Sequence, residues 1–351
     1  MKVKFSFIPI LLLIALALAA VKAFAQSQTE RYRVMFYNVE NLFDPFDDSL
    51  KLDDEFTSRG TRYWTWNRME DKINKTYKTI TAVGEWDLPM IVGFCEVENR
   101  FVVNRLIKET PLARFGYELV HRESPDARGI DVALIYRPDL FSLLEKHWFR
   151  VEFPEGNDRK TREILYVSGI VDGADTLHVF VNHWPSKYGG ELESEPGRMA
   201  AAATLRHKVD SIRVFYPNAK MLLMGDFNDE PLSAPLVKGL GACDPASEQC
   251  PSGLVNLSLP LAKAGLGSHK YQGTWSLIDQ MVVTQSLYVN ELGLSVLAPG
   301  QRIYSAPFLL EPDQAYVGSK PFRTYVGFKY NGGFSDHLPV YVDLVMGRAN
   351  W

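Results

Sequence analysis

Apolar and aromatic residues gather along the chain in short runs that are bounded by polar residues, glycine or proline. Runs of this length that are rich in Val, Ile, Leu, Phe and Tyr are typical of β-strands. Strands are therefore predicted at Tyr32–Val39, Pro89–Cys95, Gly116–His121, Ile130–Tyr136, Ile164–Val171, Thr176–Val181, Lys220–Met224, Leu277–Val283 and Leu338–Leu344.

Two stretches between these runs have a helical spacing instead. Apolar or aromatic residues recur every three or four positions from Met69 to Val83, and a similar face extends from Ser194, a candidate N-cap, to Ile212. Strands thus alternate with helices in places and follow one another directly in others. This order predicts mixed β-sheets with helices outside, folded as one α/β domain.

The N-terminus has the layout of a secretory signal peptide. Lys2 and Lys4 precede an apolar run that extends to about Val21, and Ala23-Phe24-Ala25 supplies a small-x-small cleavage pattern. We expect residues 1–25 to be removed and 26–351 to form the functional domain, in the periplasm or outside the cell. An uncleaved anchor is the alternative, but no later stretch is apolar enough to span a bilayer, so no stable membrane insertion is expected after cleavage.

Composition and charge narrow the possible partners. The 351 residues are 46% hydrophobic with a formal net charge of −4, and loss of the leader removes three lysines and no acid. A nucleic-acid partner would therefore need a local basic patch. Export permits a disulfide between Cys243 and Cys250, which flank a polar loop, whereas Cys95 is expected to be a buried thiol.

Polar residues follow the ends of several predicted strands, which is where α/β sheets usually build their sites. Asn38 and Glu40 are two residues apart and would project from the same face of an extended chain, and Glu96 closes another strand. Amide and carboxylate oxygens are the ligands that Mg²⁺ prefers. Taken singly, each could instead begin a turn or cap a helix.

Two further clusters follow later strands. Asn182 and His183 come directly after Val181, and His183 could donate a hydrogen bond to a phosphate oxygen, although a lone histidine is more often structural. Asp226 and Asn228 follow Gly225 at another strand end and form the more specific motif Gly-Asp-Phe-Asn.

A carboxylate and an imidazole are adjacent at Asp336 and His337, before the last predicted strand. His337 is a natural general base because the ordinary pKa of histidine is near neutrality. Asp279, an acid within an otherwise apolar strand, could orient His337, or it could be a buried aspartate without a catalytic task.

The order of these segments resembles that of the endonuclease/exonuclease/phosphatase superfamily, from about Arg33 to Val345. Its most specific parts here are residues 225–228 and 335–340, and the segments Tyr-Asn-Val-Glu-Asn-Leu-Phe-Asp at 37–44 and His-Trp-Pro-Ser at 183–186 resemble secreted bacterial members. The resemblance implies a four-layer α/β sandwich, with two packed mixed β-sheets flanked by helices, and a magnesium or manganese site.

The resemblance also implies roles for the strand-end residues. Metal ligands would be Asn38, Glu40, Glu96 and Asp336. Asp226 and Asn228 would position the attacking water and bind phosphate, with Asn182 and His183 also facing phosphate. Asp279 would orient His337, and the base could be Asp226 rather than His337.

Two flanking features could shape substrate choice. Arg128 could clamp a phosphate with two hydrogen bonds, or pair with Asp126 or Asp131. Basic and aromatic residues are interspersed in the stretch 59–78. They could bind a nucleic-acid strand, or they could be the solvated face of the 69–83 helix.

The predicted function is hydrolysis of phosphodiesters by a secreted, nuclease-like monomer with Mg²⁺ or Mn²⁺, on a phosphoester substrate that includes nucleic acid among the candidates. A phosphomonoesterase or a sphingomyelinase-like hydrolase of phospholipid headgroups is the enzymatic alternative. An inactive relative that binds a phosphorylated ligand is the alternative of a different class.

Overall fold

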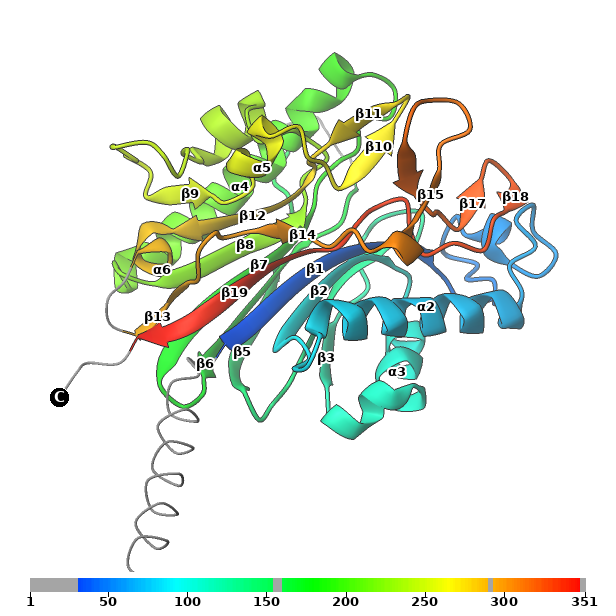
Figure 1. Ribbon diagram of the computed structural model, residues 1–351, viewed down its shortest axis with the longest axis horizontal. Coiled ribbons are helices and arrows are strands. Elements are labelled where there is room, and N and C mark those ends of the chain that lie inside the picture. The colour runs from blue at the N-terminus through cyan, green and yellow to red at the C-terminus, as the bar shows by residue number, and fades with distance from the viewer. Residues whose placement is uncertain (1–30, 154–159, 290–292, 348–351) are drawn as a thin grey trace, which may run out of the picture. The chain divides into compact units, whose positions relative to one another are not determined.

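The computed structural model describes residues 31–153, 160–289 and 293–347. The chain divides into a unit at Met1–Arg31 and a unit at Tyr32–Trp351. The predicted signal peptide lies outside the described residues. The second unit is built on two large β-sheets (Figure 1).

The first sheet has the strand order β13-β19-β1-β2-β4-β3, with β14 paired to β19. β1 and β2 are parallel, and β4 is antiparallel to β2 and β3. Its strands are β1 (Arg31–Leu42), β2 (Ile91–Val97), β3 (Glu118–His121), β4 (Asp131–Tyr136), β13 (Gly293–Val296), β14 (Arg302–Ile303) and β19 (Val340–Gly347).

The second sheet has the order β5-β6-β7-β8-β12-β9, in which only β7 and β8 are parallel. Both sheets are therefore mixed or mostly antiparallel. The strands are β5 (Phe141–Phe149), β6 (Ile164–Val171), β7 (Asp175–His183), β8 (Lys220–Asp226), β9 (Leu254–Asn256) and β12 (Asp279–Thr284).

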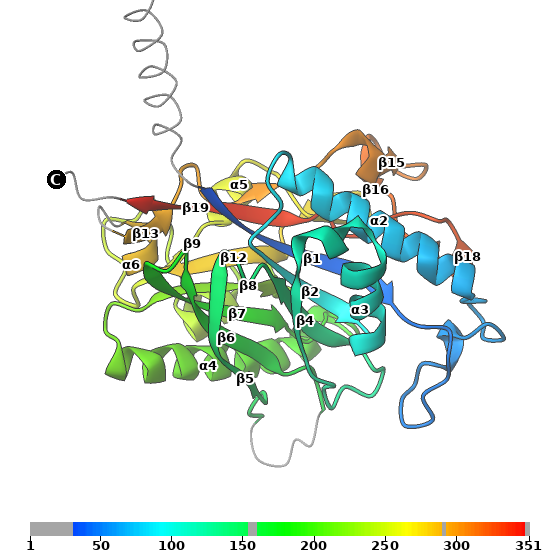
Figure 2. The same ribbon diagram turned by 90° about the horizontal axis from the view of Figure 1, so that it is seen from below.

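Helices cover the outer face of each sheet (Figures 1 and 2). Helices α2 (Trp66–Gly84) and α3 (Arg100–Glu109) share a buried apolar cluster with β1, β2 and β4. Helix α4 (Glu191–Phe215) shares another cluster with β6, β7, β8 and β12. Two short helices, α5 (Leu259–Lys263) and α6 (Gln285–Tyr288), complete the α-helices of the described residues.

Short elements fill the connections. Three small hairpins, β10–β11, β15–β16 and β17–β18, stand apart from the large sheets. The bounds are η1 (Asp54–Phe56), η2 (Pro111–Phe115), η3 (Pro235–Leu240), η4 (Pro307–Leu309), β10 (His269–Tyr271), β11 (Thr274–Ser276), β15 (Leu310–Pro312), β16 (Ser319–Pro321), β17 (Tyr325–Val326) and β18 (Lys329–Tyr330).

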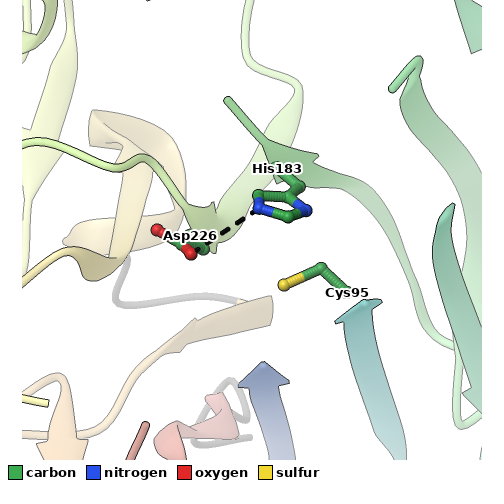
Figure 3. Close-up of side chains that lie close together, drawn as sticks. All are labelled: Cys95, His183 and Asp226. Atoms are coloured by element: carbon green, nitrogen blue, oxygen red, sulfur yellow. Dashed lines mark ion pairs between the residues drawn. The ribbon is translucent and has the colours of Figure 1, made fainter. Parts of the chain in front are cut away.

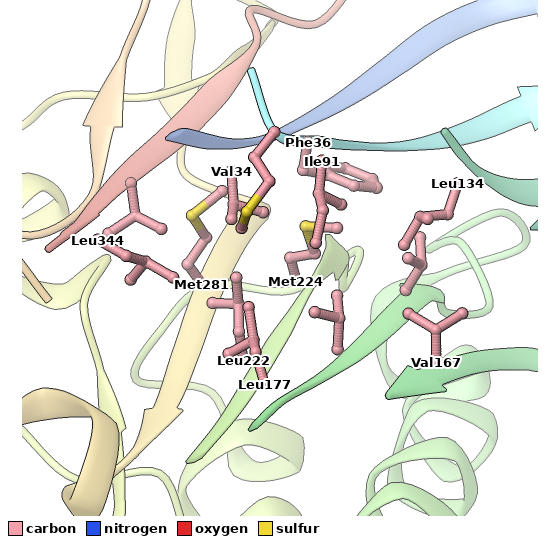
Figure 4. Close-up of a cluster of buried hydrophobic side chains, with 14 of the residues drawn as sticks. Val34, Phe36, Ile91, Leu134, Val167, Leu177, Leu222, Met224, Met281 and Leu344 are labelled. Carbon is pink, nitrogen blue, oxygen red and sulfur yellow. The ribbon is translucent and has the colours of Figure 1, made fainter. Parts of the chain in front are cut away.

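The main core lies between the two sheets, where apolar side chains from both inner faces interdigitate (Figure 4). Because side chains alternate along a strand, Val34 and Phe36 of β1 face this core while Met35 and Tyr37 face the helices. The result is the four-layer α/β sandwich that the resemblance implied. The fold class is confirmed.

All nine predicted strands form, most of them within two residues of the expected bounds, and both predicted helices form. The predicted N-cap is wrong: α4 begins at Glu191, and the Ser194 hydroxyl donates to the carbonyl of Gly190 within the first turn. Strand β5 and helix α3 were not predicted. β5 pairs only with β6 and half of it is exposed, so its sequence lacks a continuous apolar run.

Cys243 and Cys250 form a disulfide, and Cys95 is a free, buried thiol. Both observations agree with the expectations for these residues. No helix within the described ranges is long and apolar enough to cross a membrane.

Candidate active site

The alternation of side chains along the strands determines which polar residues face the space between the sheets. Asn38 continues the inner-face series of Val34 and Phe36 on β1. His183 continues Val179 and Val181 on β7 in the same way. Each apolar series therefore ends in a polar side chain at the edge of the core.

Strand pairing brings three of these residues side by side on the second sheet. Asp226, which ends β8, is opposite His183 of the parallel β7 and opposite Asp279 of the antiparallel β12. All three are at most 5% exposed. An acid, an imidazole and a second acid are thus aligned across three adjacent strands.

Asn38 connects this row to the first sheet. Its Nδ2 atom lies 3.1 Å from Asp226 Oδ2 and 3.4 Å from Glu96 Oε1. Glu96 has a positive φ of 60°, and the β2–β4 register shifts between Cys95 and Val97. This bulge turns the Glu96 carboxylate toward the inner cluster, since an unbroken strand would place it on the face opposite Cys95.

The two ring nitrogens of His337 have different neighbours. Its Nδ1 atom is 2.7 Å from Asp279 Oδ2, which also accepts a hydrogen bond from the Ser268 hydroxyl at 2.5 Å. Its Nε2 atom lies 3.5 Å from Asn38 Nδ2 and 3.9 Å from Asp226 Oδ2. The ring therefore presents Nε2 to the cluster while Nδ1 is committed to Asp279.

The two imidazoles differ in charge preference. Burial would lower the pKa of His337, but the adjacent Asp279 carboxylate outweighs it and holds this pKa well above the usual value. Burial lowers the pKa of His183 well below the usual value, and the cations of Arg162 and Arg128 add to the effect. The surroundings of His337 therefore favour its protonated form, and those of His183 favour its neutral form.

Asp226 is the central acid of the cluster. Its Oδ1 accepts the backbone N–H of Asn228 at 2.9 Å, and its Oδ2 faces Asn38, His183 and His337. Burial raises the pKa of Asp226 to about 7, against the lowering effect of His337. The site thus holds a carboxylate whose charge is only partly compensated by the protein.

Glu40 does not join the cluster. Its Oε1 is 3.3 Å from Arg323 Nε, and its Oε2 accepts the Thr324 backbone N–H at 2.6 Å. The reason is local, because Glu40 and Asn41 have φ values of 49° and 56°, which breaks the extended geometry that would have kept Glu40 on the face of Asn38. The expectation that Asn38 and Glu40 share a face is corrected, and the geometry gives no support to Glu40 as a ligand beside Asn38.

Asp336 lies between the cluster and Arg323. Its Oδ1 is 3.9 Å from His337 Nε2, and its Oδ2 accepts a hydrogen bond from Arg323 at 2.9 Å. Burial alone would raise the pKa of Asp336, but the guanidinium of Arg323 holds it below the usual value. The surroundings therefore favour the ionised form of Asp336, which lies beside His269 and His337.

Three other predicted residues surround the cluster. Asn182 is fully buried; its Nδ2 donates to the Met224 carbonyl and its Oδ1 accepts the Trp184 indole N–H, so it braces β7 against β8. Asn228 donates from Nδ2 to the carbonyl of Trp184. Arg128 is about half exposed and pairs with Asp126 at 3.3 Å, which was the alternative to phosphate binding.

The donor set fits a divalent cation. Glu96 Oε1 and Asp226 Oδ2 both lie at the Asn38 Nδ2 atom, so two carboxylate oxygens approach one position. Asp226, Asp279 and His337 offer atoms within 4.8 Å of one another, and of these the carboxylates are the candidate ligands because His337 is committed to Asp279. Carboxylate and amide oxygens suit Mg²⁺ or Mn²⁺. A cation would also favour the ionised form of Asp226, whose pKa is raised first by burial and then by the nearby Asp279 and Glu96 carboxylates.

Sequence reasoning missed three residues beside the cluster. Lys72 is buried and donates to Thr324 and to the Phe334 carbonyl, and burial lowers its pKa to about 8. Arg323 bridges Glu40 and Asp336. His269 lies against His337 with ring centroids 4.8 Å apart. Of these three residues, only Lys72 could have been singled out from the sequence, because it lies close to the apolar face of the predicted 69–83 helix.

Residues 33–346 match the Endonuclease/Exonuclease/phosphatase family. Among solved structures, TDP2 from D. rerio complexed with a single-strand DNA product is similar at a TM-score of 0.55 and 13% identity, covering 90% of this chain and 99% of that chain. The human Nocturnin catalytic domain with a bound sulfate anion is similar at a TM-score of 0.53 and 17% identity, covering 91% and 98%.

A family protein from Bacteroides thetaiotaomicron is similar at a TM-score of 0.52 and 17% identity, covering 91% of this chain and 99% of that chain. No curated protein matches the sequence. At these identities the structural likenesses show the fold, whereas the family match extends over nearly all of the second unit. The chain belongs to the endonuclease/exonuclease/phosphatase family.

Proposed function

We propose that the protein is an exported, divalent-cation-dependent phosphodiesterase with nuclease-like action. The observation that carries the proposal is the convergence of the Glu96 and Asp226 carboxylates on the Asn38 amide, with the imidazoles of His183 and His337 directed at the same Asp226 oxygen. Phosphodiester hydrolysis needs these groups together: oxygen donors for a cation, a proton acceptor for water, and N–H donors for phosphate.

Glu96 and Asp226 would hold Mg²⁺ or Mn²⁺ through carboxylate oxygens. Asn38 would contribute its amide oxygen only if the amide turned over, because Oδ1 accepts the Glu40 backbone N–H and Nδ2 faces both carboxylates. Asp336, beside His337, is a further candidate acid. When bound, the cation supplies Lewis-acid stabilisation of the charge on the phosphate oxygens. Arg323 keeps Asp336 ionised, so this acid is ready to bind a cation without first losing a proton.

Asp226 accepts the proton of the attacking water in this proposal, and His337 donates from Nε2 to a phosphate oxygen. Asp279 fixes the His337 ring by taking its Nδ1–H, so Nε2 must face the substrate. This division takes the alternative in which Asp226 rather than His337 is the base, and the support for it is the Asp279 carboxylate, which favours the protonated form of His337. His183 is a second donor toward the same phosphate.

The substrate is proposed to be a nucleic-acid strand or another phosphodiester. D. rerio TDP2, which has a similar fold, was crystallised with a single-strand DNA product, and this supports the choice. The basic stretch 59–78 contributes less than its composition suggests, because Arg62, Arg68 and Lys75 all bond backbone carbonyls within the protein. Arg128 and Arg323 are partly exposed, and their charges act on His183 and Asp336, respectively.

The test is hydrolysis of bis-p-nitrophenyl phosphate by the mature chain. We expect activity that EDTA abolishes and Mg²⁺ restores, and a loss of at least about a hundredfold in Asp226→Ala or His337→Ala. Near-normal turnover in either variant would refute the assignment of that residue. Binding of phosphoesters without any turnover would favour the inactive relative instead.

A panel of plasmid DNA, RNA, sphingomyelin and inositol phosphates under saturating Mg²⁺ identifies the substrate class. Faster turnover of DNA or RNA supports the nuclease-like proposal, and a preference for sphingomyelin supports the headgroup hydrolase. Export is tested separately by N-terminal sequencing of the protein recovered from the periplasm and the medium. The expected first residue is Gln26.

A further inference from the structure

A buried thiol lies against two residues of the candidate active site. Cys95, His183 and Asp226 each offer one ligand atom, and these atoms lie within 4.8 Å of one another (Figure 3). The three residues come from β2, β7 and β8, so the group joins both sheets at the floor of the cluster. They are 0, 5 and 2% exposed, respectively.

The geometry is close to that of a zinc site with three protein ligands. Zn–S and Zn–N or Zn–O bonds of about 2.3 and 2.0–2.1 Å place tetrahedral ligand atoms about 3.3–3.8 Å apart. His183 Nε2 and Asp226 Oδ2 are 3.8 Å apart. The Cys95 sulfur lies within 4.8 Å of both atoms, so shifts of up to about 1 Å would close the three ligands on one ion.

The tautomer of His183 is compatible with a cation at Nε2, the nitrogen that faces Asp226. The Nδ1 atom of His183 is buried and has no hydrogen-bond partner, so nothing in the described protein fixes which ring nitrogen carries the proton. An imidazole beside a thiol and a carboxylate offers the nitrogen, sulfur and oxygen ligands that Zn²⁺ accepts.

We propose that Cys95, His183 and Asp226 form a Zn²⁺ site, with water in the fourth position, whose occupation blocks the active site. Zn²⁺ accepts thiolate, imidazole and carboxylate ligands, whereas Mg²⁺ does not select sulfur. Bound Zn²⁺ would take Asp226 Oδ2 and the His183 imidazole away from water and phosphate. Inhibition of hydrolysis by Zn²⁺ rests on the proposed function, whereas binding of Zn²⁺ to these three residues does not.

The competing explanation is that Cys95 is only a packing residue, because its side chain also belongs to the apolar core between the sheets. The two readings differ in a measurable way. The chain has three cysteines and two of them form the disulfide, so any thiolate–metal bond in the oxidised protein must come from Cys95.

The first experiment uses Co²⁺ as a spectroscopic probe of the intact, oxidised protein. We expect one Co²⁺ per chain, a thiolate-to-cobalt charge-transfer band in the near ultraviolet, and displacement of the band by Zn²⁺. Cys95→Ser should lose the band while its circular dichroism remains that of the wild type. Absence of the band in wild-type protein saturated with Co²⁺ would overturn the site, whether or not the protein hydrolyses phosphoesters.

The second experiment measures Mg²⁺-dependent hydrolysis during a Zn²⁺ titration. Cys95→Ser and Cys95→Ala should hydrolyse as fast as the wild type without Zn²⁺ and should need at least about tenfold more Zn²⁺ for half inhibition, since loss of one ligand weakens binding by at least that factor. Equal Zn²⁺ sensitivity in all three proteins would overturn the inhibitory role. If no protein shows hydrolysis, the proposed function fails, and the cobalt spectrum still decides the site.

Discussion

The Asp279–His337 pair offers the sharpest test of how the site works. In Asp279→Asn the carboxylate that accepts His337 Nδ1–H at 2.7 Å becomes a neutral amide of the same shape. The Ser268 hydroxyl can still donate to the remaining oxygen. The substitution therefore removes charge from the pair while leaving its packing nearly unchanged.

The size of the effect follows from burial. Asp279 is 1% and His337 7% exposed, so water does not screen the pair. A hydrogen bond to a charged group contributes about 1.5–3 kcal/mol, and each 1.4 kcal/mol is tenfold in rate. If the interaction is fully expressed in the transition state, kcat falls by roughly 10–150-fold, with little change in KM.

The pH dependence gives a second readout. Asp279 holds the pKa of His337 well above the usual value, and its replacement should lower that pKa. A raised native pKa stabilises the fold fully below about pH 6.5, where an unfolded histidine titrates, and this stabilisation is lost as pH rises through the native pKa. The difference in Tm between wild type and variant should therefore be largest below about pH 6.5 and should shrink as pH rises through the native pKa of His337.

The assay is bis-p-nitrophenyl phosphate hydrolysis across pH, with histidine titration followed by NMR and assigned through a His337 variant. The matched control is Asp131→Asn, which alters a second buried pair, His121 Nε2 to Asp131 Oδ2 at 3.0 Å, on the helix-facing side of β4. The control should lose stability without a change in the pH–rate profile. An unaltered His337 pKa in Asp279→Asn, or an equal activity loss in the control, would refute the reasoning.

Two further changes test other features. Asp226→Asn should abolish hydrolysis and yet raise Tm at pH 8 but not at pH 4. Burial raises the native pKa of Asp226 to about 7, so the wild-type fold loses stability as pH rises from about 4, where an unfolded aspartate ionises, to about 7. A lower Tm of the variant at pH 8 in thermal denaturation would contradict this account. Replacement of Cys243 and Cys250 by serine should lower the free energy of unfolding in urea by about 2.5 kcal/mol, the entropy of closing so short a loop. An unchanged urea midpoint would show that the disulfide does not restrict the unfolded chain.

Local sequence was sufficient to place the strands and the polar residues that end them. The period-2 alternation of β1 and β8 predicts that Asn38 and Asp226 continue an apolar face, because neighbouring side chains on a strand point to opposite sides. The same reasoning failed at Glu40, where a positive φ breaks the extended backbone. Periodicity predicts the face of a residue only as far as the chain stays extended.

The identity of each residue's neighbours was decided by tertiary structure alone. Arg323 contacts Glu40 across 283 positions, and Lys72 bonds the Phe334 carbonyl across 262. Such contacts depend on how the two sheets pack and on where the long connection before β19 runs. Neither can be predicted from the secondary-structure preferences of neighbouring residues. The sequence by itself therefore determined the fold class and most of the chemical groups, whereas their partners, charges and the thiol beneath them came only from packing the two sheets together.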